Sequence, residues 1–181
     1  DVKLPDGRGI ACLYPGAFPA DDGKSDQTPP VEKLDPPMET PKVTFKQYIE
    51  PETGDVDITK QNILVGVGRG IQSQDNVQLA EDLAQVLGGA VCASRPVIDQ
   101  GWQPLSRQVG KSGMTVKPRV YFALGISGAP EHWEGMQNSQ CIIAVNTDPK
   151  APIFDGAHIG VVGDVLELLP VLTDKVKARK G

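Results

Sequence analysis

The stretch "YFALGISGAPEHWEGM", residues 121–136, joins an apolar run directly to a glycine-rich turn and then to the start of a helix. The run has the length of a strand and ends at Gly125, and Ser127 and Gly128 follow within three residues. Pro130 suits the first position of a helix, which needs no N–H donor. This succession is typical of a parallel sheet covered by helices, in which the turn at the strand end is open to a ligand.

Four further apolar runs of strand length surround this stretch, and none of them alternates between apolar and polar residues. Strands of this kind are buried on both faces, and helical patterns separate them. The sequence therefore predicts an α/β fold: an open parallel sheet with helices on both faces, Rossmann-like, over residues 58–181. The four other predicted strands are "NILVGVG", "AVCAS", "CIIAVN" and "IGVVG".

Two helices can be placed between and after these strands. Residues 75–87 carry Val77, Ala80, Ala84 and Leu87 on one helical face, and the pair Gly88-Gly89 is typical of a helix end. The last helix is expected to begin at Asp164, whose carboxylate can accept the free N–H groups of the first turn. Its predicted buried face carries a different set, namely Leu168, Leu172 and Val176.

Residues 1–57 have a different composition. Nine of the 16 prolines fall in residues 1–60, which excludes a continuous helix or a central strand there. We expect a short strand at residues 9–14, a linker at 21–41 and a further strand at 42–48. The chain begins with Asp1 and shows no signal-peptide pattern, which is typical of a fragment or a processed form.

The composition limits the classes of function. The 181 residues carry a formal net charge of −5 and no run of Lys or Arg, which argues against nucleic-acid binding. No apolar stretch approaches the ~20 residues that span a bilayer. Cys12, Cys92 and Cys141 are scattered, so we expect three buried, unpaired thiols in a reducing compartment rather than a disulfide or a metal site.

Glycines, hydroxyl groups and arginines follow the predicted strands. Because the carboxyl ends of parallel strands share one edge of the sheet, these groups should converge there and bind an anion such as a pyrophosphate. The spacing Gly66-x-Gly68-x-Gly70 differs from the dinucleotide fingerprint, and Ser94 stands where an acidic ribose ligand is expected, so a standard NAD site is disfavoured. Ser127 lacks the G-x-S-x-G setting of a nucleophile, and His132 is poorly placed to act as its base.

Six motifs carry a resemblance to a known family: "VGVGRG", "ASRPVIDQGW", "RQVGKSG", "ALGISGA", "AVNTDPKAPIF" and "IGVVGD". The fourth motif continues through Glu131 and His132 to Gly135 and Met136. In this order the six motifs resemble the FAD domain of the electron transfer flavoprotein alpha subunit. The resemblance covers roughly residues 62–175. It implies that residues 1–57 are the remnant of an N-terminal domain and that residues 58–181 form the FAD-binding domain.

The resemblance implies an electron carrier with bound FAD rather than an enzyme. Such an alpha subunit pairs with a beta subunit, accepts electrons from flavin dehydrogenases and passes them singly to a quinone reductase or another acceptor. The implied location is the cytoplasm of a bacterium or archaeon, or the mitochondrial matrix of a eukaryote.

Each site residue is implied by its position within a motif. Arg69 and Ser94 would contact the cofactor, and Arg95 would lie against the flavin ring. His132 would approach the flavin O2, Ser112 would lie near N5, and Asn146 with Asp164 and Val165 would hold the adenosine half. The remaining implied cofactor-binding residues are Val109, Gly110, Lys111, Ser127, Gly128, Ala129, Pro130 and Glu131.

Glu131 departs from the family pattern, which commonly has a glutamine there. A carboxylate near the ring would oppose negative charge on the reduced flavin. Two other classes of function remain open at this point. One is an enzyme that uses a nicotinamide or an acyl-CoA on the same fold, and the other is a regulatory subunit without flavin.

Overall fold

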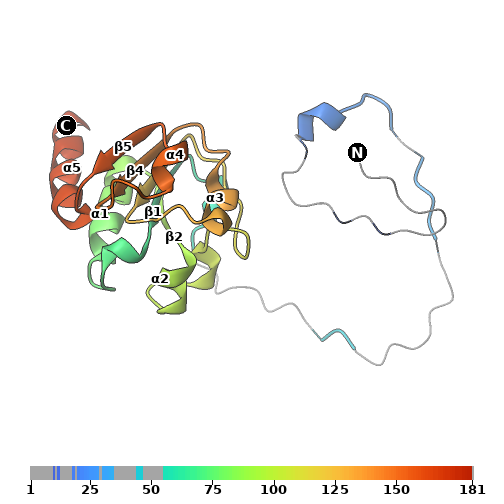
Figure 1. The fold of residues 1–181 in the computed structure, drawn as a ribbon. Helices are drawn as coiled ribbons and strands as arrows, with labels where there is room; N and C mark the ends of the chain where they lie inside the picture. The colour runs from blue at the N-terminus through green and yellow to red at the C-terminus, as the bar shows by residue number, and fades with distance from the viewer. Residues whose placement is uncertain are drawn as a thin grey trace. The chain divides into compact units, whose positions relative to one another are not determined.

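The computed structural model describes residues 10, 12, 18, 20–28, 30–34, 44–46 and 55–180 (Figure 1). The chain divides into two units, residues 1–49 and 50–181. Among the described residues of the first unit there is a 3₁₀ turn, η1 (Ala20–Gly23), which overlaps the start of the predicted linker. The strands predicted at residues 9–14 and 42–48 lie largely outside the described residues, and residues 10, 12 and 44–46 are not in a strand.

The second unit contains one five-stranded sheet in which every pair of neighbours is parallel. The strand order is β2-β1-β3-β4-β5. This confirms the predicted fold class. The strands are β1 (Ile63–Val67), β2 (Ala90–Ala93), β3 (Val120–Leu124), β4 (Ile142–Asn146) and β5 (Ile159–Val162).

Helices connect these strands and cover the sheet (Figure 1). The α-helices are α1 (Val77–Leu87), α2 (Arg95–Asp99), α3 (Pro130–Met136), α4 (Ile153–Gly156) and α5 (Val165–Lys180). Short 3₁₀ turns stand at η2 (Ile58–Lys60), η3 (Arg69–Ile71) and η4 (Leu105–Arg107). Among the described residues, no helix is both long enough and apolar enough to cross a membrane.

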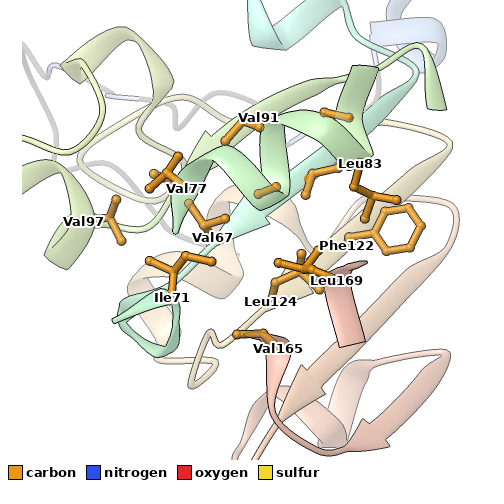
Figure 2. Packing of buried hydrophobic residues seen from close by; sticks show 14 of the residues in the cluster. Val67, Ile71, Val77, Leu83, Val91, Val97, Phe122, Leu124, Val165 and Leu169 are labelled. Atoms are coloured by element: carbon orange, nitrogen blue, oxygen red, sulfur yellow. The ribbon is translucent and has the colours of Figure 1, made fainter. Parts of the chain in front are cut away.

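Alternate residues of the inner strands enter two separate cores because successive side chains point to opposite faces of a sheet. On β3, Phe122 and Leu124 belong to the core beneath α1 and α5, whereas Tyr121 and Ala123 belong to the core beneath α3 and α4. Figure 2 shows the first of these cores, with Leu83 of α1 close to Phe122. Burial on both faces explains why β1 to β4 read as continuous apolar runs. The same expectation is wrong for the edge strand β5, where Ile159 and Val162 are exposed.

The predicted helix α1 and its end are confirmed, but the helix begins at Val77 rather than at residue 75, and Leu87 of the predicted face is only half-buried. Its buried residues include Val77, Ala80 and Ala84, and Gly88 ends the helix in the left-handed conformation with φ = 73°. The N–H of Gly89 donates to the Ala84 carbonyl at 2.8 Å. The helix therefore stops where the glycine pair predicts that it should.

The cap of α5 is confirmed, but the expected buried face is wrong by one position. Asp164 Oδ1 accepts the N–H of Leu166 at 2.8 Å. The buried residues are Val165, Leu169 and Thr173, and the predicted residues Leu168, Leu172 and Val176 are only half-buried beside them. The apolar pattern misses this stripe because a threonine occupies it, and the Thr173 hydroxyl has no hydrogen-bond partner among the described residues.

The three cysteines differ in burial. The expectation of three buried thiols is confirmed for Cys92 alone: Cys141 is only half-buried and Cys12 is exposed. All three are unpaired.

The segment that leads into β1 is anchored on the sheet. Arg107 forms an ion pair with Asp55, and its Nη1 also donates to the carbonyl of Val91 at 2.9 Å. The hydrogen bond from Arg107 is the main cause that holds the pKa of Asp55 below its usual value. The contacts of this unit thus extend to residue 55.

Candidate functional site

A cavity of about 780 Å³ lies along the edge of the sheet where all five strands end. Its walls include Arg69 after β1, Ser94 after β2, Gly125 after β3, Asn146 at the end of β4 and Gly163 after β5. Open parallel sheets bind ligands at this edge, where the strand order reverses. In this sheet the order reverses between β1 and β3.

Two loops meet by main-chain contact at that reversal. The N–H of Gly68 donates to the carbonyl of Leu124 at 2.8 Å, and the N–H of Gly70 donates to the carbonyl of Gly125 at 3.1 Å. Gly125 has φ = 62°, a conformation that side-chain-bearing residues rarely adopt. The two loops therefore form one continuous floor of the cavity.

The cavity suits a long ligand rather than a compact one. Five strands are separated by four gaps of ~4.8 Å, so their ends extend over roughly 19 Å. The two ends of the cavity also differ in charge. Arg69 and Arg95 follow β1 and β2, whereas Asp148 and Asp164 follow β4 and β5.

The structure brings most of the predicted site residues together around this cavity. Fourteen line it: Arg69, Ser94, Arg95, Val109, Gly110, Lys111, Ser112, Ser127, Ala129, Glu131, His132, Asn146, Asp164 and Val165. Gly128 and Pro130 do not. Gly128 is buried against the main chain of Ile153, and Pro130 is the exposed first residue of α3.

Some lining residues were missed by the sequence analysis. They are Gln72, Pro96, Gln108, Ile126, Thr147, Asp148, Ala151 and Pro152. Most of them lie inside the quoted motifs "ASRPVIDQGW", "RQVGKSG" and "AVNTDPKAPIF", so the motifs carry a signal for them although no single residue type does.

Arg95 lies at the rim of the cavity with its side chain largely exposed. Its Nε lies 3.4 Å from Asp99 Oδ2, one helical turn further along α2. Such a surface pair contributes little to stability. The guanidinium group is therefore close to the cavity and can approach a bound anionic group at small cost.

The loop of residues 109–112 is held by its main chain and presents a hydroxyl group. The N–H of Val109 donates to Ala93 at 2.9 Å, and that of Lys111 donates to Glu131 at 2.7 Å. The Nε2 of Gln108, which is buried, donates to Ser112 Oγ at 2.9 Å. Because this oxygen already accepts a hydrogen bond, the Ser112 proton can be donated elsewhere.

His132 is the most deeply buried titratable residue in the cavity wall, at 7% exposure. Its Nε2 lies 3.1 Å from the hydroxyl of Tyr121, and its Nδ1 has no hydrogen-bond partner among the described residues. Burial lowers the pKa of His132 to about 4, and this effect outweighs a smaller one from the main chain of Val109, which by itself would raise the pKa. The ring is therefore neutral at pH 7.

Asn146 and Asp164 hold the opposite end of the cavity in shape. Asn146 Nδ2 donates to the carbonyl of Ile126 at 3.0 Å, and its Oδ1 accepts the N–H of Asp148 at 2.9 Å. Asp164 caps α5. Asn146 thus fixes the loops around it, Asp164 fixes the start of α5, and both residues form part of the cavity wall.

A metal site has no support in the part of the chain that the structure describes, where no three His, Cys, Asp or Glu side chains gather as ligands. His158, the second histidine, lies outside the cavity wall. Its Nδ1 accepts the N–H of Ile142 at 3.0 Å, which gives it a structural role.

Comparisons with known proteins point to one family. Residues 57–137 match the model of the electron transfer flavoprotein FAD-binding domain. The chain is 52% identical over 136 residues to Protein FixB of Azotobacter vinelandii, which is 75% of this chain. It is 52% identical over 125 residues, 69% of the chain, to electron transfer flavoprotein subunit alpha of Mycobacterium leprae. It is also 52% identical over 129 residues, 70% of the chain, to acryloyl-CoA reductase electron transfer subunit beta of Anaerotignum propionicum.

The chain spans less than two fifths of the length of these three relatives. The matched stretches cover 38%, 39% and 35% of them, respectively.

The burial of His132 predicts a specific loss of stability in acid. The pKa of His132 is about 4 in the folded chain and near 6.5 in the unfolded chain. Protonation therefore favours unfolding as the pH falls from about 6.5 to 4, by up to roughly 3 kcal/mol. Urea unfolding at pH 7.5 and pH 4.5 should show this loss for the wild type and a clearly smaller loss for His132→Gln. Equal losses of unfolding free energy in the wild type and in His132→Gln would show that His132 is not the cause.

Proposed function

Because this chain carries the FAD-binding domain of the electron transfer flavoprotein alpha family, we propose that it is the FAD-holding subunit of an electron carrier. The observation that supports this most directly is the single cavity wall that joins fourteen residues implied by the family motifs. These residues come from loops after all five strands, so their convergence depends on the fold and not on sequence proximity.

The residues present fit FAD. The cavity volume of about 780 Å³ falls within the ~300–1,000 Å³ that is usual for cofactor sites, and its length suits an extended dinucleotide. The buried Nδ1 of His132 has no hydrogen-bond partner in the described part of the chain, as expected of a group that meets a ligand. Arg69 and Ser94 would contact the cofactor, residues 109–112 would enclose the ring, and residues 127–132 would follow the pyrophosphate side.

Bound FAD supplies a ring that takes up and releases electrons one or two at a time. The task of the protein is to set the charge around that ring. Arg95 and an N–H of His132 would stabilise negative charge, and the Ser112 hydroxyl would donate a hydrogen bond. Asn146, Asp164 and Val165 would hold the adenosine end.

The partners follow from the same proposal. We expect a beta subunit to complete the carrier, flavin dehydrogenases to deliver electrons, and a quinone reductase or another acceptor to receive them. The chain would then be a carrier without a reaction of its own. Residues 1–57 would be the remnant of an N-terminal domain and residues 58–181 the FAD-binding domain.

A nicotinamide- or acyl-CoA-linked enzyme on the same fold is not favoured. Ser94, rather than an acidic residue, follows β2 at the position where a nicotinamide dinucleotide site places its ribose ligand. The names of the relatives, which describe electron-transfer subunits, agree with this choice.

Retention of FAD tests the proposal. The purified chain is mixed with FAD, desalted and examined by visible absorption, with and without an added beta subunit. We expect flavin bands in the protein fraction, and weaker retention for Arg69→Gln by roughly tenfold, since one charged hydrogen bond contributes about 1.5 kcal/mol or more. A protein that stays colourless even with a beta subunit would contradict the proposal.

Substitutions of charged residues in the cavity wall test whether these charges set the midpoint potential of the bound flavin. Glu131→Gln should raise the flavin midpoint potential and Arg95→Gln should lower it, each on the order of tens of millivolts for a partly exposed charge. The matched controls are Glu167→Gln and Lys117→Gln, which remove exposed charges outside the cavity wall. Potentials are measured by stepwise reduction. Unchanged values at both sites would show that these charges do not face the ring.

A further inference from the structure

Behind His132 lies a short row of buried polar side chains. The Sγ of Cys92 donates to the hydroxyl of Tyr121 at 3.4 Å, and that hydroxyl lies 3.1 Å from His132 Nε2. Cys92 and Tyr121 are fully buried, on β2 and β3 respectively. The row therefore runs from the interior of the sheet to the wall of the cavity.

The neighbouring strand is shaped to admit the Tyr121 hydroxyl. Gly66 on β1 pairs with Cys92 on one side and with Ala123 on the other. A Cβ atom at Gly66 would collide with the hydroxyl and ring of Tyr121. A larger residue at 66 would thus displace the group that contacts His132.

All three side chains of this row are neutral near pH 7. Burial raises the pKa of Cys92 to about 12 and raises that of Tyr121 well above its usual value. Burial also lowers the pKa of His132 to about 4. The imidazole therefore carries one proton, which must be on either Nδ1 or Nε2.

The two tautomers differ in the hydrogen bonds that they allow Tyr121 and His132 to form. With the proton on Nε2, the Tyr121 oxygen would accept from both Cys92 and His132, and neither of them would be left to accept the proton of the Tyr121 hydroxyl. Nδ1 would then also be a buried acceptor without a partner. With the proton on Nδ1, Tyr121 donates to Nε2, and the group of this row that has no hydrogen-bond partner among the described residues is the Nδ1–H of His132, a residue that lines the cavity.

We propose that Tyr121 is a positioning residue: its hydroxyl donates to Nε2 of His132 and thereby fixes the tautomer whose Nδ1–H is available to a ligand in the cavity. The ligand is the FAD of the proposed function, and the inference rests on that function only for the ligand's identity. The tautomer itself can be measured without any ligand.

The first experiment is ¹⁵N NMR of the histidine-labelled chain without FAD at pH 7.5. The chain has two histidines, and His158 is an internal reference because its Nδ1 accepts from Ile142, which requires the opposite tautomer. A His158→Gln variant assigns the signals. We expect an Nδ1–H tautomer for His132. An Nε2–H tautomer in the wild type would overturn the proposal without any variant of Tyr121.

The second experiment uses Tyr121→Phe, which removes only the hydroxyl. His132 should lose its preference for Nδ1–H, and FAD should bind roughly three- to tenfold more weakly, as expected for one lost hydrogen bond. The matched control is Thr173→Val, which removes a buried hydroxyl in the opposite core and should change neither quantity. An unchanged tautomer in Tyr121→Phe would overturn the proposal.

The FAD titration separates this inference from the proposed function. If the wild type fails to bind FAD even with a beta subunit, the proposed function fails, while the NMR result still decides the role of Tyr121. If Tyr121→Phe changes the tautomer but binds FAD as tightly as the wild type, the tautomer does not serve the ligand, and the proposal is overturned.

Discussion

The main-chain contact between the loops after β1 and β3 is the constraint on which the site depends. Gly68 and Gly70 donate to the carbonyls of Leu124 and Gly125, so the two loops are joined at the point where the strand order reverses. A Cβ at Gly68 would collide with the main chain of Gly125. The contact therefore requires glycine, and it places the segment that leads to α3 and His132 against the end of β1.

The groups that would meet a ligand are supported from behind by buried polar side chains. Gln108 donates to the Ser112 hydroxyl, and Tyr121 contacts His132. In each pair the inner residue is almost completely buried, so its position is fixed by packing. Fixed donors of this kind lose little conformational entropy on binding and need little reorganisation when charge develops. By contrast, the charged side chains of Arg95 and Glu131 are exposed. They are suited to adjusting the electrostatic potential at a bound ligand rather than to fixing the geometry of the site.

Strands β1 to β4 and helix α1 could be predicted from the sequence because burial on both faces leaves an unbroken apolar run and because a glycine pair marks a helix end. Strand β5 was also predicted, but its apolar run does not reflect burial, since Ile159 and Val162 are exposed. The family resemblance is confirmed, and its motifs located most of the cavity wall. The buried face of α5 could not be predicted, since Thr173 looks polar but packs inward. Gln108 and Tyr121 were also missed as supports of Ser112 and His132, because such pairs become visible only when β2, β3 and α3 are seen together. The individual roles of the site residues stay predictions.

Amide hydrogen exchange of the chain with and without FAD, in the presence of a beta subunit, tests the central claim most directly. We expect one extended ligand to occupy the whole edge of the sheet and to add protection in the loops along it, from residues 68–72 and 94–96 through 109–112 and 125–132 to 146–152 and 163–166. Protection confined to one end of the sheet, or found away from these loops, would contradict that claim.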